Sequence, residues 1–180
     1  MNIESMSNEQ YGFLFDVRRS IRYHDRRRAF FERLHQITGG LTVLLAGSVL
    51  FDIARPGDSP WWLLAIAAVA ALLSAWDIVV GYASKATLHR DLKGRFCELE
   101  AKIFVGDAAA DTWASYRAAR LRIEQDEPPI YRALDLLCHN ELLLAEGYGR
   151  DGDDGKHFVT VPGFKRLTSH FIHWANWRAA

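Results

Sequence analysis

Residues 61–83 read WWLLAIAAVAALLSAWDIVVGYA, a stretch of 23 residues whose only charged side chain is Asp77. As an α-helix it would be about 34 Å long, enough to cross a hydrocarbon core of about 30 Å with some tilt. A buried helix of a soluble bundle can have a similar composition, so the neighbouring residues must be considered with it. Taken together with them, the stretch predicts a transmembrane helix.

A second apolar stretch precedes the first. Residues 37–54 read ITGGLTVLLAGSVLFDIA, about 27 Å of helix and barely enough to span. Residues 55–60, RPGDSP, join the two and are typical of a turn. So short a link predicts two antiparallel helices in a hairpin, with Trp61 and Trp62 in the aromatic belt at the membrane surface.

Basic residues flank this hairpin asymmetrically. Many stand on the chain to either side of it, whereas the connecting turn holds only Arg55. They are Arg18, Arg19, Arg22, Arg26, Arg27, Arg28 and Arg33 before the hairpin, and Lys85, Arg90, Lys93, Arg95 and Lys102 after it. Because positive charge stays on the cytoplasmic side, we expect a multi-pass protein of the inner-membrane type with both termini in the cytoplasm.

The flanking segments predict long cytoplasmic helices, so the fold class is an all-α membrane protein whose hairpin continues into a helical bundle. Residues 10–36 carry apolar or aromatic side chains at 14, 17, 21, 24, 31 and 34, and should run into the first span. Residues 84–104 should continue the second span, with Gly94 as a weak point. Their apolar side holds Leu88, Leu92, Phe96, Leu99 and Ile103.

The sequence divides into four regions: a basic amphipathic helix at 1–36, the hairpin at 37–83, a helical region at 84–149, and a loop with an amphipathic helix at 150–180. Within the last two regions we expect the following segments, in chain order. They are a helix over 112–127 capped by Asp111, a break at Pro128-Pro129, a helix over 130–148, a loop at 151–156, a short strand or extended arm at 157–161, and a helix over 164–178. The last helix either lies on the inner leaflet, with Trp174 and Trp177 at headgroup depth, or packs against the cytoplasmic helices.

Asp77 is the residue of greatest functional interest, because a carboxylate within a span is energetically expensive. It shares a helix face with small residues at 3–4 spacing: Ala67, Ala70, Ser74, Gly81 and Ser84. One hypothesis makes this face a subunit interface or pore wall. The alternative has Asp77 near the cytoplasmic end of its helix, paired with Lys85 or an arginine of the first helix.

The juxtamembrane residues Arg26, Arg27, Arg28 and Lys85, with Trp61 and Trp62, suit lipid headgroups better than nucleic acid. The 22 basic and 22 acidic residues balance, so no net field attracts a polyanion. We expect no metal and no cofactor, since only His170 and His173 lie at helical spacing. No catalytic motif is present, and the only candidates for an enzyme site are Glu124, Asp126, Glu127, His139 and Glu141, interpreted as ion-pair partners of Arg117, Arg120 and Arg122.

The order of these features resembles the SLATT family, bacterial two-helix membrane domains associated with SMODS and SLOG proteins. The resemblance covers about residues 10–147 and rests on short motifs around the hairpin. These are Ser20-Ile21-Arg22-Tyr23-His24, Phe30-Phe31 and Leu34; then Lys85-Ala86, Leu88-His89, Asp91-Leu92, Arg95-Phe96 and Leu99-Glu100; then Arg120-Leu121, Ile123-Glu124, Asp126-Glu127-Pro128-Pro129, Ala133-Leu134 and His139-Asn140-Glu141.

The resemblance implies an oligomeric effector that forms pores or perturbs the membrane in a bacterial conflict system, switched on by a nucleotide-signalling or sensor protein. This chain carries no fused synthase or sensor domain, so either a separate partner protein or a stand-alone role is expected. The alternative is a non-conducting membrane scaffold whose cytoplasmic helices recruit another protein. Two spans cannot enclose a channel, so either a pore or a scaffold lattice would need a homo-oligomer.

Overall fold

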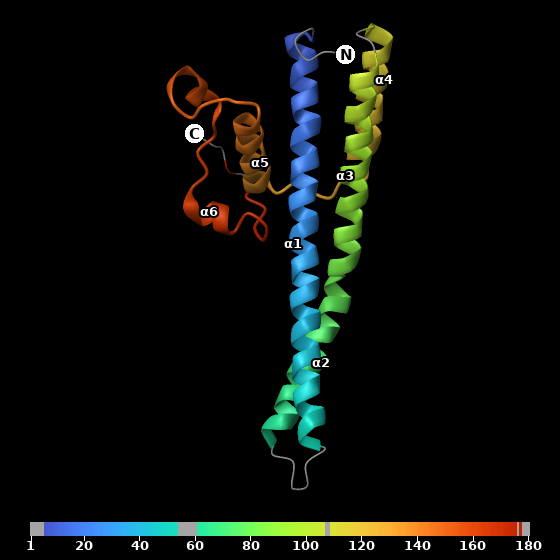
Figure 1. Ribbon diagram of the computed structural model, residues 1–180, viewed down its shortest axis with the longest axis vertical. Coiled ribbons are helices and arrows are strands. Elements are labelled where there is room, and N and C mark those ends of the chain that lie inside the picture. Colours follow the sequence, from blue (N-terminus) through green and yellow to red (C-terminus); the bar gives the residue numbers. More distant parts are fainter. Residues whose placement is uncertain (1–5, 54–60, 107–108, 176, 178–180) are drawn as a thin grey trace. The chain divides into compact units, whose positions relative to one another are not determined.

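The computed structural model describes residues 6–53, 61–106, 109–175 and 177, with only the backbone at 51–53. The described residues are all helical or irregular and include no strand, as Figure 1 shows. The helices are α1 (Asn8–Ile53), α2 (Trp61–Val80), α3 (Tyr82–Val105), α4 (Ala110–Glu124), α5 (Arg132–Ala145), the 3₁₀ helix η2 (Gly152–His157) and α6 (Gly163–Leu167). The all-α class is confirmed.

The chain divides into two compact units. The first combines Met1–Arg27 with His89–Ala180, and the second is Arg28–Leu88. Each unit takes part of α1 and part of α3, so the predicted boundaries at 36 and 84 do not coincide with those of the compact units.

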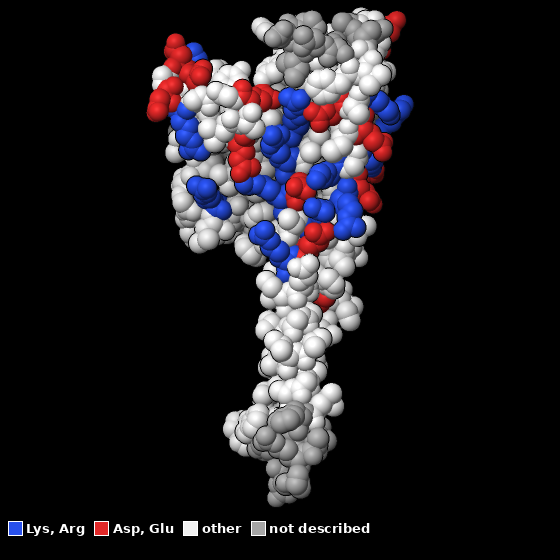
Figure 2. Space-filling view, in the orientation of Figure 1, with Lys and Arg blue, Asp and Glu red and all other residues white. Residues whose placement is uncertain are grey.

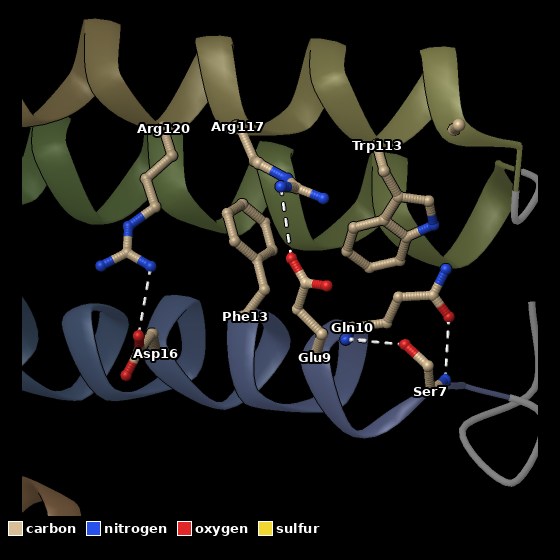
Figure 3. A pocket seen from close by; sticks show the side chains of 9 residues that line it. Ser7, Glu9, Gln10, Phe13, Asp16, Trp113, Arg117 and Arg120 are labelled. Atoms are coloured by element: carbon tan, nitrogen blue, oxygen red, sulfur yellow. Dashed lines mark hydrogen bonds and ion pairs between the residues drawn. The ribbon is translucent and has the colours of Figure 1, made fainter.

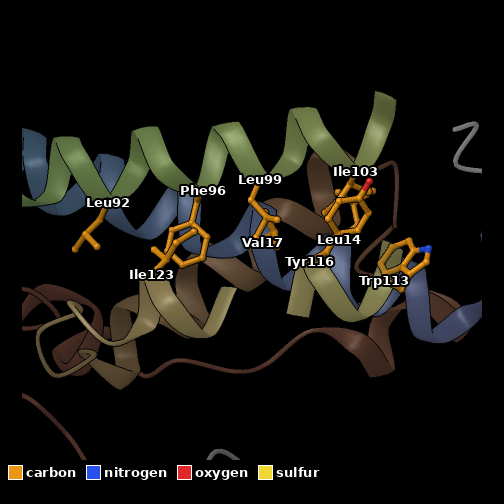
Figure 4. Packing of buried hydrophobic residues seen from close by; sticks show 9 residues of the cluster. All are labelled: Leu14, Val17, Leu92, Phe96, Leu99, Ile103, Trp113, Tyr116 and Ile123. Atoms are coloured by element: carbon orange, nitrogen blue, oxygen red, sulfur yellow. The ribbon is translucent and has the colours of Figure 1, made fainter. Parts of the chain in front are cut away.

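The core of the first unit lies among α1, α3 and α4 (Figure 4). The predicted apolar side of α3 supplies four of its residues, and Leu88 of that series is partly exposed. The nine core residues are Leu14, Val17, Leu92, Phe96, Leu99, Ile103, Trp113, Tyr116 and Ile123. Burying each large apolar side chain stabilises the unit by about 1.5–3 kcal/mol before conformational entropy is counted.

A smaller cluster packs α5 in the same unit. Tyr23 of α1 contacts Leu134 and Cys138, and Tyr131 packs at its edge. The amide of Tyr131 donates a hydrogen bond of 3.0 Å to the Tyr23 hydroxyl, directly before α5 begins. This contact follows the Pro128-Pro129 break, so Tyr23 fixes the point at which the chain resumes its helical path.

The second span does not continue as one uninterrupted helix. Gly81 separates α2 from α3 and has φ of 67°, which a residue with a Cβ adopts only under strain. Its amide still donates to the Asp77 carbonyl, and its own carbonyl accepts from Lys85. The break therefore falls at Gly81, whereas Gly94, the predicted weak point, lies inside α3.

The chain after α3 differs from three expectations. Residues 152–157 form η2 instead of a loop, and the predicted cap Asp111 stands within the first turn of α4, after Ala109 at the N-cap. The predicted helix over 164–178 is wrong beyond Leu167, where α6 ends. Trp174 has φ of 45°, a conformation that a right-handed helix cannot contain.

Of the predicted strand or arm at 157–161, His157 ends η2, and residues 158–161 form an extended arm that Asn140 binds. Asn140 of α5 donates from Nδ2 to the Val159 carbonyl at 2.7 Å and accepts from the Val159 amide at 2.9 Å. Asn140 is 8% exposed, so both bonds are shielded from water.

Replacing Asn140 with alanine should lower the free energy of unfolding by about 1–3 kcal/mol, because both backbone groups of Val159 lose their partner. Denaturant unfolding of the full chain in detergent measures this change, and hydrogen exchange should show faster exchange at Val159. The exposed amide of Gln125 offers the control, since Gln125→Ala should change stability by less than about 0.5 kcal/mol. Unaltered exchange at Val159 in Asn140→Ala would show that other contacts hold the arm.

Candidate functional site

Within the second unit, residues 37–50 and 61–80 have an apolar outward surface. These described residues contain a single charged side chain, Asp77. The large exposed side chains include Val43, Leu44 and Leu50 of α1 and Trp61, Leu64, Leu72, Ile78 and Val79 of α2, each at least 68% exposed. In Figure 2 the part that carries these residues shows almost no Lys, Arg, Asp or Glu on its visible described surface. Continuous apolar exposure of this kind suits contact with lipid or protein, since water disfavours it.

Among the residues that the structure describes, one helix is long and apolar enough to cross a membrane by length and composition. It is α2 taken together with α3 across the Gly81 turn, and 11% of its most apolar window is buried. A core helix of a soluble protein would be mostly buried. The end of the predicted first span at 54 and the turn at 55–60 lie outside the described residues, so the two-helix hairpin remains a prediction.

Asp77 has a partner that sequence reasoning missed. Its Oδ2 lies 2.8 Å from Nδ1 of His35 on α1, and both residues belong to the second unit. Lys85, one predicted partner, instead has its ammonium 5.7 Å from the centre of the Phe31 ring. The sequence contained a usable signal. In an antiparallel hairpin the start of the first span lies beside the end of the second, so His35, just before the first span, would lie at about the same membrane depth as Asp77.

The predicted small-residue face is divided within the unit. Ala70 is buried, and Ala67, Asp77 and Gly81 are half-buried. By contrast, Ser74 and Ser84 are exposed. Only the two serines of this face therefore offer a free surface to another copy of the chain, and their role in a pore or subunit interface remains a prediction.

The expected headgroup contacts differ from one another. Arg27 is 5% exposed, donates from Nη1 to the His170 carbonyl at 2.8 Å, and lies 4.2 Å from the centre of the Tyr131 ring. Its predicted lipid contact is therefore wrong, because the guanidinium is packed inside the first unit. Arg26 forms an ion pair with Glu141 on the same unit.

The other predicted headgroup contacts belong to the second unit. Arg28 lies 3.7 Å from the carboxylate of Glu32, one turn further along α1. Trp61 is 82% exposed and Trp62 45% exposed, as residues of an aromatic belt would be. Their contact with headgroups stays a prediction.

The five polar residues considered for an enzyme site do not come together. Each has a separate partner in the first unit, and only Glu124 pairs with one of the expected arginines. The contacts are Glu124 with Arg120 at 2.6 Å, Asp126 with Arg95 at 2.5 Å, Glu127 with His24 at 2.9 Å, Glu141 with Arg26, and His139 with the His157 carbonyl at 3.1 Å. The expected shared network at the proline bend is therefore wrong, and the contacts stabilise several helix pairs independently.

A buried histidine pair is the main feature that the sequence did not reveal. Nδ1 of His24 on α1 lies 2.9 Å from Nδ1 of His89 on α3, and the two residues are 1% and 2% exposed. Nε2 of His24 lies 2.9 Å from the Glu127 carboxylate. One hydrogen bond therefore joins the two Nδ1 atoms, and which ring donates it depends on the tautomers.

Burial determines the ionisation of several groups in the first unit. Burial and the neighbouring charges of His24 and Arg27 lower the pKa of His89 to about 3. Burial raises the pKa of the Cys138 thiol to about 12 and that of the Tyr23 hydroxyl to about 12. At neutral pH these three side chains are therefore uncharged. His89 is too weakly basic to hold a proton, Cys138 is a thiol instead of a thiolate, and Tyr23 is a phenol instead of a phenolate.

A pocket of about 430 Å³ lies between the start of α1 and α4 (Figure 3). Its charged residues pair across it: Arg117 with Glu9 at 3.2 Å, and Arg120 with Asp16 at 3.3 Å. Trp113 lines the same pocket. Because these charges neutralise one another, the pocket has no excess charge to select an anion or a cation.

The described part of the chain contains no group of three His, Cys, Asp or Glu side chains that could hold a metal ion. Comparisons with protein-family models, curated proteins and solved structures found no match to this chain.

Proposed function

We propose that this protein is an oligomeric membrane effector of a bacterial conflict or anti-phage system, which forms pores in the inner membrane or perturbs it. The observation that carries the proposal is the outward apolar surface of residues 37–50 and 61–80 in the second unit, with its one half-buried charge at Asp77. A two-helix hairpin with both chain ends in the cytoplasm places that surface in lipid. The first unit then lies in the cytoplasm, where a separate nucleotide-signalling or sensor protein can reach it.

A pore requires several copies, because two helices cannot enclose a channel. Ser74 and Ser84 lie outward on the second unit, and a Cβ added at Gly47 on α1 would meet no atom within 4 Å. Small residues of this kind let helices of neighbouring copies approach closely in a bilayer. They support assembly through the membrane segment.

A non-conducting scaffold is the second candidate, and the His35–Asp77 pair favours it. One oxygen of the Asp77 carboxylate, Oδ2, is held 2.8 Å from His35 within the same chain, so the group is turned towards α1. Its other oxygen, Oδ1, is buried and has no hydrogen-bond partner. A scaffold would expose the first unit to a cytoplasmic partner and leave the membrane sealed.

Induced expression of the full chain in bacteria, followed with a dye for membrane potential, separates the two functions. An effector should depolarise the cells, alone or beside its activating partner, and Ser74→Leu should weaken the effect at least several-fold by blocking close approach of copies. The matched control is Leu72→Ile, which retains an apolar side chain at an exposed position. An unchanged potential with inserted wild-type oligomer, even beside the partner, supports the scaffold and rejects the effector.

Insertion itself is measured separately. Resistance to alkaline carbonate extraction reports an integral protein. A cysteine placed at Asp58 in the predicted turn should react with an impermeant maleimide added outside the inner membrane, whereas Cys97 should not. Labelling of Cys97 alone would reverse the orientation, and complete extraction by carbonate would exclude the membrane assignment.

A further inference from the structure

The last described segment exposes a set of large apolar side chains. Phe164, Leu167 and Phe171 are 65%, 79% and 67% exposed, and Ile172 is 41% exposed. We call these four residues the C-terminal apolar surface. They belong to the first unit, whereas the apolar residues 37–50 and 61–80 belong to the second.

This segment is fixed to the first unit by its backbone. Arg27 donates to the His170 carbonyl at 2.8 Å, and the amide of Arg132 donates to the His173 carbonyl at 3.4 Å. The His173 ring also lies 4.7 Å from the Tyr131 ring, centre to centre. The inward groups are thus held by α1 and by the residues that begin α5. The C-terminal apolar surface is consequently presented outward on an ordered support, with less entropy to lose on docking.

The sequence segment that carries this surface has charges of one sign. The sequence from 155 to 180 holds four basic residues, Lys156, Lys165, Arg166 and Arg178, and no acidic residue, although the whole chain is neutral. Arg166 is exposed beside Leu167. Trp174 and Trp177 lie close by, 5.2 and 4.0 Å from the Lys165 ammonium to each ring centre. Aromatic, aliphatic and basic side chains in one place are the composition of segments that lie in the headgroup region of an anionic bilayer.

We propose that the C-terminal apolar surface docks on the cytoplasmic leaflet of the membrane, inserting Phe164, Leu167 and Phe171 among anionic headgroups. Lys165 and Arg166 add electrostatic attraction. The inference rests on the proposed function to the extent that the hairpin brings a bilayer within reach. A second contact with the leaflet would restrain the first unit at the membrane surface.

The test uses the full chain with Cys97→Ser in nanodiscs of phosphatidylcholine with 30% phosphatidylglycerol, or of phosphatidylcholine alone. Cys138 is buried, with its pKa raised to about 12, so this parent should remain unlabelled. An environment-sensitive fluorophore is attached at Leu167→Cys, at Leu72→Cys in the predicted second span, or at Ala118→Cys on an exposed site of α4. Quenching by spin-labelled lipid reports contact with the bilayer.

We expect quenching at 72 in both nanodiscs, quenching at 167 that is several-fold stronger with phosphatidylglycerol, and none at 118. Lys165→Glu with Arg166→Glu should weaken the quenching at 167 by at least fivefold. Quenching at 72 without any at 167 overturns the docking proposal and leaves the membrane assignment intact. No quenching at 72 refutes the membrane insertion instead. A shielded but unquenched label at 167 means that protein covers the surface, and this too overturns the proposal.

Discussion

Acidification from neutral pH to pH 3 should remove on the order of 4 kcal/mol from the free energy of unfolding through His89 alone. The pKa of this side chain is about 3 in the folded protein, against about 6.5 for an ordinary histidine. Between these values the unfolded chain binds the proton and the folded chain does not. The contribution of the neutral His89 to the free energy of unfolding is therefore fully present above pH 6.5 and is lost as the pH falls towards 3.

The physical cause is the position of the ring. Charging His89 would place a cation in a site that is 2% exposed, next to His24 and within the field of the Arg27 guanidinium. Glu127 contacts the far nitrogen of His24, not His89, so its carboxylate compensates the first ring more directly than the second. Tyr23 packs edge-on against both rings and supplies no negative charge at these pH values.

Denaturant unfolding of the full chain in detergent, measured at pH 6.5 and pH 5, tests this expectation before most carboxylates titrate. Wild type should lose roughly 1.5–2 kcal/mol more over this interval than His89→Gln, which removes the titrating group. The control His157→Gln alters an exposed histidine and should keep the wild-type slope. If the free energy of unfolding changed equally with pH in wild type and His89→Gln, His89 would bind a proton in the folded protein as readily as in the unfolded chain, and the expectation would be wrong.

The periodicity of the sequence was sufficient to predict the main core. Apolar residues at 3–4 spacing placed Leu92, Phe96, Leu99 and Ile103 on one side of a helix, and all four are buried. This pattern can be read within one helix, because every α-helix that packs against others must bury an apolar side. The same pattern placed His24 on the apolar face of α1 but did not indicate its polar partners.

Partner choice could not be predicted in the same way. His24 pairs with His89, which is 65 residues away, and with Glu127, which is 103 away. Those contacts depend on which faces of three helices meet, and no spacing within one helix encodes this. The helix break shows the same limit: Gly81 and Gly94 have equal intrinsic propensity, and only Gly81 adopts a positive φ.

Replacing Phe96 with alanine should have the largest effect of any single core substitution, about 3–5 kcal/mol of lost stability. Phe96 is fully buried at the centre of the first unit, where α3 meets α1 and α4 (Figure 4). Its ring also stacks on His24, with centres 5.6 Å apart and planes inclined by 16°. Truncation therefore opens a cavity and removes one wall of the histidine pair at the same time.

This double role distinguishes Phe96→Ala from an ordinary cavity mutation. Water entering the space could solvate His24 and His89, so the variant should lose part of the pH dependence as well as stability. The exposed Phe171, a ring of equal size, provides the matched control: Phe171→Ala should shift unfolding in detergent by less than about 0.5 kcal/mol and keep the wild-type pH slope. Phe96→Leu should fall between them. If Phe96→Ala unfolded like the Phe171 variant, α3 would not pack on α1 and α4 as described, and the dry environment of the histidine pair would lose its physical basis.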